Sequence, residues 1–347
     1  MEYNEISKDK KINIGIQILR MILSFWIVTI HSYFFKNKYS LKRHFDQKMF
    51  HVPTFMLISF FFFYHHLSKR DSHKIKRRFK RLLIPYFTWS FVYLLINNAI
   101  LKVFGIKNFK RLISFKDFFF QILLCNIYYA NFWYINVLLF LSLLFSIIAY
   151  IAKNNFLFII QLIGYMTYFL HYSSIYNFLR KHNLFNRFCL SLLLEIQITP
   201  VAVIGLTFGY FNLIYYINKC SFRIIIFCIL FLFCLVKFNI FQNHDGYLYQ
   251  NIELNTLGAI NLFIIFSSLN FESVKNKKLL SFIKLISSNT GGIYYIHSFI
   301  RSYLKYFIKS IKYGTFRGTI FLYIISHFIC FFGSKIFSKN SLKFLFI

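Results

Sequence analysis

The chain has 347 residues, of which 58% are apolar and 22% aromatic, whereas only 15% are charged. Soluble domains usually carry about 25% charged residues, so this composition excludes a disordered chain, a collagen-like chain and an ordinary soluble enzyme. Lysine and arginine total 41 against 10 acidic residues, which gives a formal net charge of +31. Such an excess favours contact with anionic lipid headgroups or with an anionic ligand. The sequence therefore predicts a membrane protein with several spans.

Ten apolar segments are long enough to cross a bilayer as helices, which takes about 20 residues each. They cover residues 14–35, 50–67, 82–101, 131–152, 156–173, 188–211, 222–238, 254–270, 291–308 and 318–337. We predict an all-α integral membrane fold, a bundle of about ten transmembrane helices that forms one domain over residues 1–347. The apolar but interrupted segment 115–130 is either a surface-lying or re-entrant helix or an eleventh span.

One loop dominates the orientation signal. Ser68–Arg81 contains eight lysines and arginines and one acid, and basic loops favour the cytoplasmic side. We therefore expect this loop and both termini in the cytoplasm, although the basic segment 36–48 would then lie outside.

The six cysteines show no zinc-binding spacing, and most lie in apolar runs, which predicts free, buried thiols.

Two ionisable residues lie in the first span, IGIQILRMILSFWIVTIHSYFF. Arg20 and His31 are eleven residues apart, so they share one helix face at an axial separation of about 16 Å. Ionisable groups inside a span mark a functional site by default. The structural alternative is that Arg20 extends to the inner headgroups and His31 faces the outer interface.

A second pair of basic residues follows the second span, in KRRFKRLLIPY. Arg78 and Arg81 are three residues apart, so in a helix they share a face one turn apart. Two guanidinium groups at this spacing can bind a phosphate or diphosphate with paired hydrogen bonds. The alternative is a cytoplasmic anchor that binds acidic lipid.

Later spans add further polar candidates. Glu195 is the only acid well inside a predicted span, so its carboxyl is either protonated or paired. It can pair with Arg20, orient a histidine or bind a substrate hydroxyl. His297 and Arg301 in GGIYYIHSFIR are four residues apart and also share a face.

Taken in order, these residues resemble the acyltransferase-3 family, multi-span enzymes that acylate sugars of bacterial surface polysaccharides and other acceptors. The resemblance covers about residues 12–335. It rests on Arg20 and His31, then FHVPTFMLISF, the Arg78 and Arg81 pair with RLLIPY, FWYI before span four, and GGIYYIHSF. The family often has Ser-Gly-Tyr in span two and Trp-Phe before span four, where this chain has Ser59-Phe60 and Trp133-Tyr134.

The resemblance implies transfer of an acyl group, most often acetyl, from acyl-CoA to a hydroxyl of a surface-polysaccharide sugar or its lipid-linked precursor. It implies a catalytic site around Arg20 and His31, with His31 as either the general base or the covalent carrier. We add Glu195 to the catalytic residues in an assisting part, because it is the only acid well inside a predicted span. Arg78 and Arg81 would bind the phosphates of acetyl-CoA. The implied location is the bacterial cytoplasmic membrane, with membrane lipids as further partners.

The resemblance to this family implies no metal, no permanently bound cofactor and no nucleic-acid partner. Two other functions fit ten apolar spans with buried charges. The chain could transport a lipid-linked sugar or another anion without acyl transfer, or it could be a structural subunit of a polysaccharide-assembly complex. The sequence does not set the sugar, the hydroxyl position or the oligomeric state.

Overall fold

The computed structural model contains only helices and short connections in the parts of the chain that it describes. These parts are residues 13–31, 50–104, 132–173, 187–217, 222–241, 252–269, 277–307, 316–338 and 341–346. No strand occurs in them. The predicted all-α class is therefore confirmed over these residues, whereas segments 36–48 and 115–130 lie outside the described ranges.

Ten helices of 16 residues or more occur in the described ranges, one at each predicted span. They are α1 (Ile14–His31), α3 (His51–Ser68), α4 (Ser72–Phe104), α6 (Trp133–Ala152), α7 (Phe156–His171), α9 (Arg187–Tyr210), α11 (Phe222–Phe241), α12 (Ile252–Ser268), α14 (Thr290–Phe307) and α15 (Phe316–Ile336). Shorter elements are η1 (Lys153–Asn155), α10 (Leu213–Ile217), α13 (Lys277–Ser288) and η3 (Ser341–Leu345).

Four described segments are long and apolar enough, by length and composition, to cross a membrane. They are Ile14–His31, Ser72–Ile96, Trp133–His171 and Arg317–Ile336. That all ten long helices cross the membrane remains a prediction.

The outer surfaces of α6 and α7 carry continuous rows of exposed apolar side chains. The exposed residues are Phe140, Leu143, Ile147 and Ile151 on α6, and Phe158, Leu162, Tyr165 and Phe169 on α7. The spacing of three and four residues places each row on one helix face. Contiguous apolar surface of this kind is rare on soluble monomers, and hydrocarbon satisfies it in a membrane.

Among the described cysteines, Cys228 and Cys330 are buried as expected, but Cys234 is exposed.

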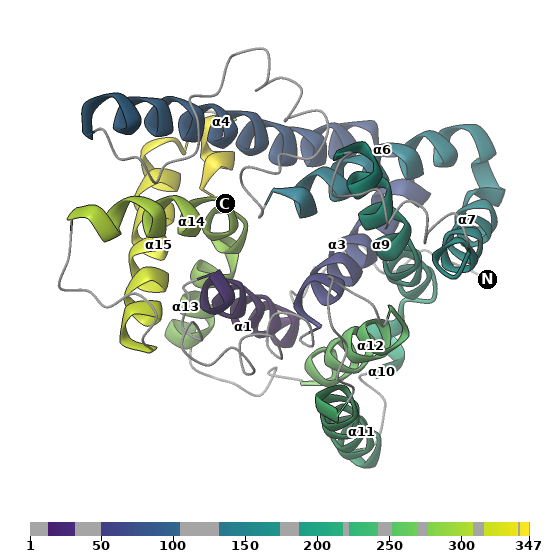
Figure 1. Cartoon of the computed structure of the whole chain (residues 1–347). Helices are drawn as coiled ribbons and strands as arrows, with labels where there is room; N and C mark the ends of the chain where they lie inside the picture. The colour runs from purple at the N-terminus through teal and green to yellow at the C-terminus, as the bar shows by residue number, and fades with distance from the viewer. Residues whose placement is uncertain are drawn as a thin grey trace.

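The helices surround a central region (Figure 1). The α4 helix runs along one edge of the molecule, α14 and α15 lie to one side, and α6, α7 and α9 lie to the other. The α1 helix packs mainly on α12, α13, α14, α15 and α3, and α3 packs mainly on α9, α12 and α6. The helices α1, α3, α4, α6 and α14 therefore approach the centre from segments far apart in the sequence.

A close approach of two helix backbones sets the distance between α3 and α9. Gly205 and Gly209, in GLTFG, face α3, and a Cβ atom on Gly205 would lie 2.6 Å from the carbonyl oxygen of Leu57. Glycines four residues apart let membrane helices pack at short distance. A side chain at Gly205 would push α3 away from α9 at Leu57. Leu57 is only two residues before Ser59, which belongs to the candidate site.

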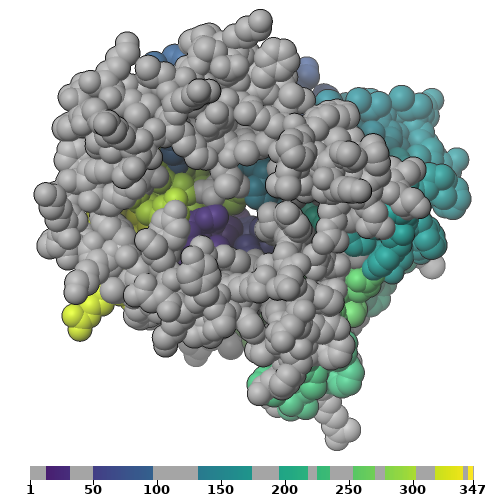
Figure 2. Space-filling view, viewed as in Figure 1, coloured from purple at the N-terminus to yellow at the C-terminus, as the bar shows by residue number. Residues whose placement is uncertain are grey.

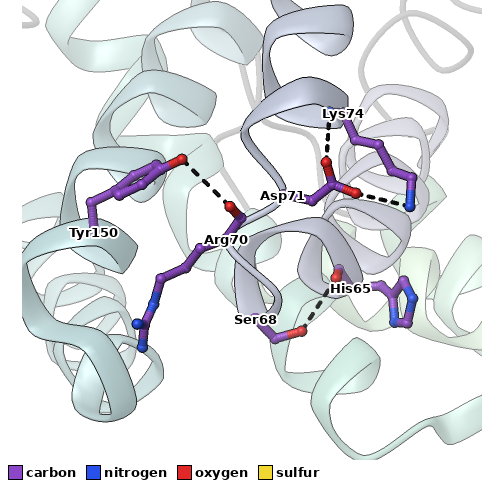
Figure 3. Close-up of polar contacts among 6 residues, drawn as sticks. All are labelled: His65, Ser68, Arg70, Asp71, Lys74 and Tyr150. Carbon is purple, nitrogen blue, oxygen red and sulfur yellow. Dashed lines mark hydrogen bonds and ion pairs between the residues drawn. The ribbon is translucent and has the colours of Figure 1, made fainter.

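The α4 helix begins ten residues earlier than its predicted span, at Ser72, so most of the basic loop is helical. Asp71 caps its first turn, because the carboxylate accepts bonds from the ammonium and the backbone amide of Lys74 at 2.9 and 3.1 Å (Figure 3). These bonds lower the pKa of the Asp71 carboxyl. Arg70 connects this turn to the end where α6 meets α7. Its backbone carbonyl accepts a hydrogen bond from the Tyr150 hydroxyl, and its guanidinium donates one to the Asn154 side chain.

We predict that Gly205→Ala lowers the thermal unfolding midpoint of the detergent-solubilised protein. The new methyl group meets backbone rather than a movable side chain, and overpacking of this kind costs about 1–3 kcal/mol. Gly164→Ala is the matched control, because its Cβ would meet only the Val203 side chain, at 3.0–3.2 Å. An equal or larger loss in the control would contradict the close backbone approach as the cause.

Candidate functional site

Arg20 lies in the first half of α1 and reaches the start of α14. Its Nη2 donates to the Thr290 hydroxyl at 3.0 Å. That hydroxyl in turn donates to the Ser287 carbonyl at 2.9 Å, so its lone pairs are left to face the guanidinium. The Arg20 side chain is only half-buried. The cation is therefore held by a neutral partner and keeps its full charge at the edge of an accessible space.

His31 ends α1 and is held by α14 at two points. The Nη1 of Arg301 donates to the His31 carbonyl oxygen, and the His31 and His297 rings lie 5.3 Å apart between centroids with a 35° tilt. The Arg20–Thr290 and His31–Arg301 pairs are each separated by 270 residues in sequence. Since the offset is the same at both ends, α1 and α14 run side by side in the same direction.

His297 is completely buried, and its hydrogen bonds define its protonation. Its Nδ1 lies 2.8 Å from the Ile293 carbonyl oxygen and its Nε2 lies 3.2 Å from the Ser298 hydroxyl. A carbonyl can only accept, so Nδ1 carries the proton. Burial favours the neutral ring, in which Nε2 then accepts from the Ser298 hydroxyl. His297 is thus fixed in one orientation behind His31. The His-x3-Arg spacing in the sequence indicated a shared face, but nothing in it showed His31 as the partner.

Arg78 on α4 is fixed by two neighbouring helices, α3 and α6. Its Nε donates to the Ser142 hydroxyl on α6 at 3.0 Å, and its Nη2 and Nη1 donate to the hydroxyl and carbonyl of Ser59 on α3 at 2.9 and 3.4 Å. The guanidinium carbon also lies 4.2 Å from the centroid of the Phe63 ring and 5.3 Å from that of Phe60. These contacts orient the group, while no described acid neutralises it.

Arg81 lies one turn further along α4 and differs from Arg78. Its side chain is exposed and makes no hydrogen bond with a described residue. It is nevertheless within range of charge interaction with both Arg20 and Arg78. Like charges collect at such distances only where a ligand or solvent compensates them. Three guanidinium groups from α1 and α4 are therefore close enough for Arg81 to interact with both of the others.

Tyr134 connects the arginines to the histidines. It is almost fully buried and interacts electrostatically with both Arg20 and Arg78. Its ring lies 5.5 Å from that of Tyr294, which in turn lies 6.4 Å from the ring of His297. A row of ring contacts thus leads from the arginine cluster to His31.

The molecule is hollowed over this region (Figure 2). Purple atoms of α1 and yellow-green atoms of the α13–α14 part of the chain are visible inside the hollow. The arrangement therefore offers a ligand a region of positive charge and, about 16 Å further along α1, an imidazole.

The structure does not bring Glu195 to this group among the contacts that it describes. Glu195 is half-buried on α9, and α9 packs mainly on α3, α7 and α6 rather than on α1. Its predicted place beside Arg20 and His31 remains a prediction. The sequence reasoning assigned no role to Ser142 and Thr290, whose only signal was a polar group in an apolar run, and it used Tyr134 only as part of the FWYI motif.

Comparison with protein families matches residues 13–337 to the acyltransferase-3 family, described as an acyltransferase domain. No curated protein and no solved structure gives a significant match. The matched range covers nearly the whole chain and includes every residue of the candidate site. The apolar helices and the family together make this a membrane protein with acyltransferase activity. The chain belongs to the acyltransferase-3 family of membrane acyltransferases.

Proposed function

We propose that this enzyme transfers an acetyl group from acetyl-CoA to a hydroxyl of a surface-polysaccharide sugar or its lipid-linked precursor, in the bacterial cytoplasmic membrane. The observation that carries the donor assignment is the convergence of Arg20, Arg78 and Arg81 without a described carboxylate to neutralise them. The acceptor assignment is supported by the family resemblance alone.

The arginine cluster suits the phosphates of CoA. Arg78 uses three of its five N–H groups on Ser59 and Ser142, so two remain for an anion in a fixed geometry. Arg81 is exposed and adds a second fork. Pre-ordered guanidinium groups lose little entropy on binding, which favours a tightly held diphosphate.

The distance along α1 favours a donor with a long arm. Arg20 and His31 are about 16 Å apart on one continuous helix. A small acyl phosphate could not contact the arginines and His31 together. A thioester at the end of the pantetheine arm could, because its phosphates and its reactive carbonyl are far apart.

In the proposed reaction His31 acts as general base. It removes the proton from the acceptor hydroxyl, the oxygen attacks the thioester carbonyl, and the C–S bond breaks to release the CoA thiolate, which takes up a proton. The alternative, in which His31 carries the acyl group covalently, uses the same two substrates. Glu195 has an assisting part in either scheme, and a wild-type rate in Glu195→Gln would remove it from the site.

His31→Ala should abolish transfer of radiolabelled acetyl from acetyl-CoA in isolated membranes, because no other described group on α1 can accept the proton. Abundance by immunoblot should stay at the wild-type level, since the Arg301 bond to the His31 backbone carbonyl survives the substitution. Near wild-type transfer would refute the proposed chemistry. A transporter of a lipid-linked sugar would instead move its substrate with no donor-dependent acetylation in either protein.

His297→Ala should lower turnover while leaving the apparent donor constant unchanged. It removes the ring contact with His31 but keeps the Arg301 bond to the His31 backbone. A purely structural role would reduce the amount of folded protein without changing turnover per molecule. Measuring both constants at matched protein abundance separates the two cases.

Arg81→Ala should raise the apparent acetyl-CoA constant about tenfold or more, because one charge-assisted paired contact contributes about 1.5–3 kcal/mol. Arg81 makes no described hydrogen bond, so its loss disturbs the fold less than the loss of Arg78. Arg81→Lys should restore little, since lysine lacks the planar fork. The matched control is Lys80→Ala, an adjacent cation on another face of α4. An equal change in the control would contradict a specific phosphate contact.

A further inference from the structure

The outward face of α4 carries an ordered series of exposed side chains. The series is basic first and apolar afterwards: His73, Lys76, Arg77, Lys80, Leu83, Phe87, Phe91 and Leu95. At 100° per residue these eight positions fall within an arc of about 120°. Figure 1 shows α4 along one edge of the molecule, which agrees with an outward face.

Beyond the point where the series changes from basic to apolar, the remaining length of α4 matches the thickness of a bilayer. α4 has 33 residues and is therefore about 50 Å long, well beyond the hydrocarbon thickness of about 30 Å. The part from Leu83 to Phe104 measures about 33 Å by the same rise per residue. The hydrocarbon boundary thus lies between Lys80 and Leu83, and the basic residues lie at the depth of the lipid headgroups.

The four basic residues have no acidic partner among the described residues. The only described ion pair at this end joins Asp71 to Lys74, on another face of the helix. With 41 basic against 10 acidic residues in the whole chain, the protein itself offers few compensating charges. Among the described residues nothing balances the positive charge of this face, which suits it to an anionic partner.

We propose that His73, Lys76, Arg77 and Lys80 form a binding site for anionic phospholipid headgroups, whose acyl chains lie along Leu83 and Phe87. A lipid fits both parts of the face at once, because its phosphate meets the cations where its chains meet the apolar row. An acidic soluble protein could contact only the basic part. Lys76 and Lys80 lie apart from Arg78 of the candidate active site, which points about 160° away from Lys80 around the helix, whereas Arg77 is only one turn before Arg81.

The test compares lipids that stay bound to the intact protein. The full chain is reconstituted in vesicles of equal parts phosphatidylglycerol and phosphatidylcholine, and native mass spectrometry gives the ratio of the two lipids retained. Lys76→Gln/Lys80→Gln should lower that ratio about fivefold for each lysine removed. Lys76→Arg/Lys80→Arg, which keeps both charges, and Lys153→Gln, an exposed cation on the α6–α7 turn, should leave it near the wild-type value.

The ratio is read per folded molecule, so a loss of yield does not affect it. An unchanged ratio in the double glutamine variant, or an equal drop in the Lys153→Gln control, would overturn the proposal. An unchanged ratio with salt-sensitive capture of an acidic soluble protein would assign the face to a protein partner and also overturn it. The apparent acetyl-CoA constant of the double glutamine variant should equal that of the wild type, whatever the outcome for Arg81.

Discussion

The charge on Arg78 is the constraint on which the centre of the molecule depends. An arginine among apolar helices costs several kcal/mol unless its donors are satisfied. Here two serines and a backbone carbonyl from α3 and α6 accept its hydrogen bonds, and two phenylalanine rings lie against its faces. None of these neighbours is negative, so the group is oriented but not neutralised. The proposed function makes this oriented, uncompensated cation a contact for the phosphates of the donor.

The same contacts determine how the surrounding helices pack. Ser59 can reach Arg78 only if α3 stays in place, and α3 is held by the close backbone contact with the glycines of α9. About four turns further along the same side of α4, the Tyr93 hydroxyl donates to the Tyr295 carbonyl at 3.1 Å and so connects α4 to α14. Since α14 also holds Arg20 and His31, one set of contacts joins Arg78 to the imidazole.

The relative directions of four helix pairs agree with helices that cross the membrane alternately in opposite directions. α1 runs parallel to α14 and α3 to α9, whereas α4 runs antiparallel to α6 and α7 to α9. Ten helices that each cross the membrane once, in the order of the sequence, require all four relations. One further crossing between α4 and α6 would reverse every relation except that of α7 with α9. The four directions observed among the described helices are thus the ones that ten alternating crossings require, and the ten crossings themselves stay a prediction.

Sequence reasoning located the helices well and the contacts between them poorly. Apolar runs of about 20 residues gave all ten long helices, because burial of backbone polar groups in lipid leaves few other structures. The shared face of Arg20 and His31 followed from helical period alone. The early start of α4 was missed, because hydropathy gives no weight to a capped basic turn. The partners of Arg78 and His31 lie 19 to 270 residues away in the sequence. Contacts between segments so far apart cannot be inferred from one sequence alone, because no local pattern marks them.

The basic run of α4 had two competing interpretations, a phosphate site and a lipid anchor, and the structure shows why both patterns occur in one segment. A helix displays residues on all sides, so consecutive arginines and lysines separate onto different faces. Arg78 points to the centre and is fixed by Ser59 and Ser142, whereas Lys76 and Lys80 are exposed on the face that continues into the apolar row. The proposed lipid site places the hydrocarbon boundary just before Leu83, and with it Arg78 and Arg81 at headgroup depth. In the proposed reaction a water-soluble, multiply charged donor then reaches the arginines without entering hydrocarbon, and only its uncharged arm extends along α1 toward His31.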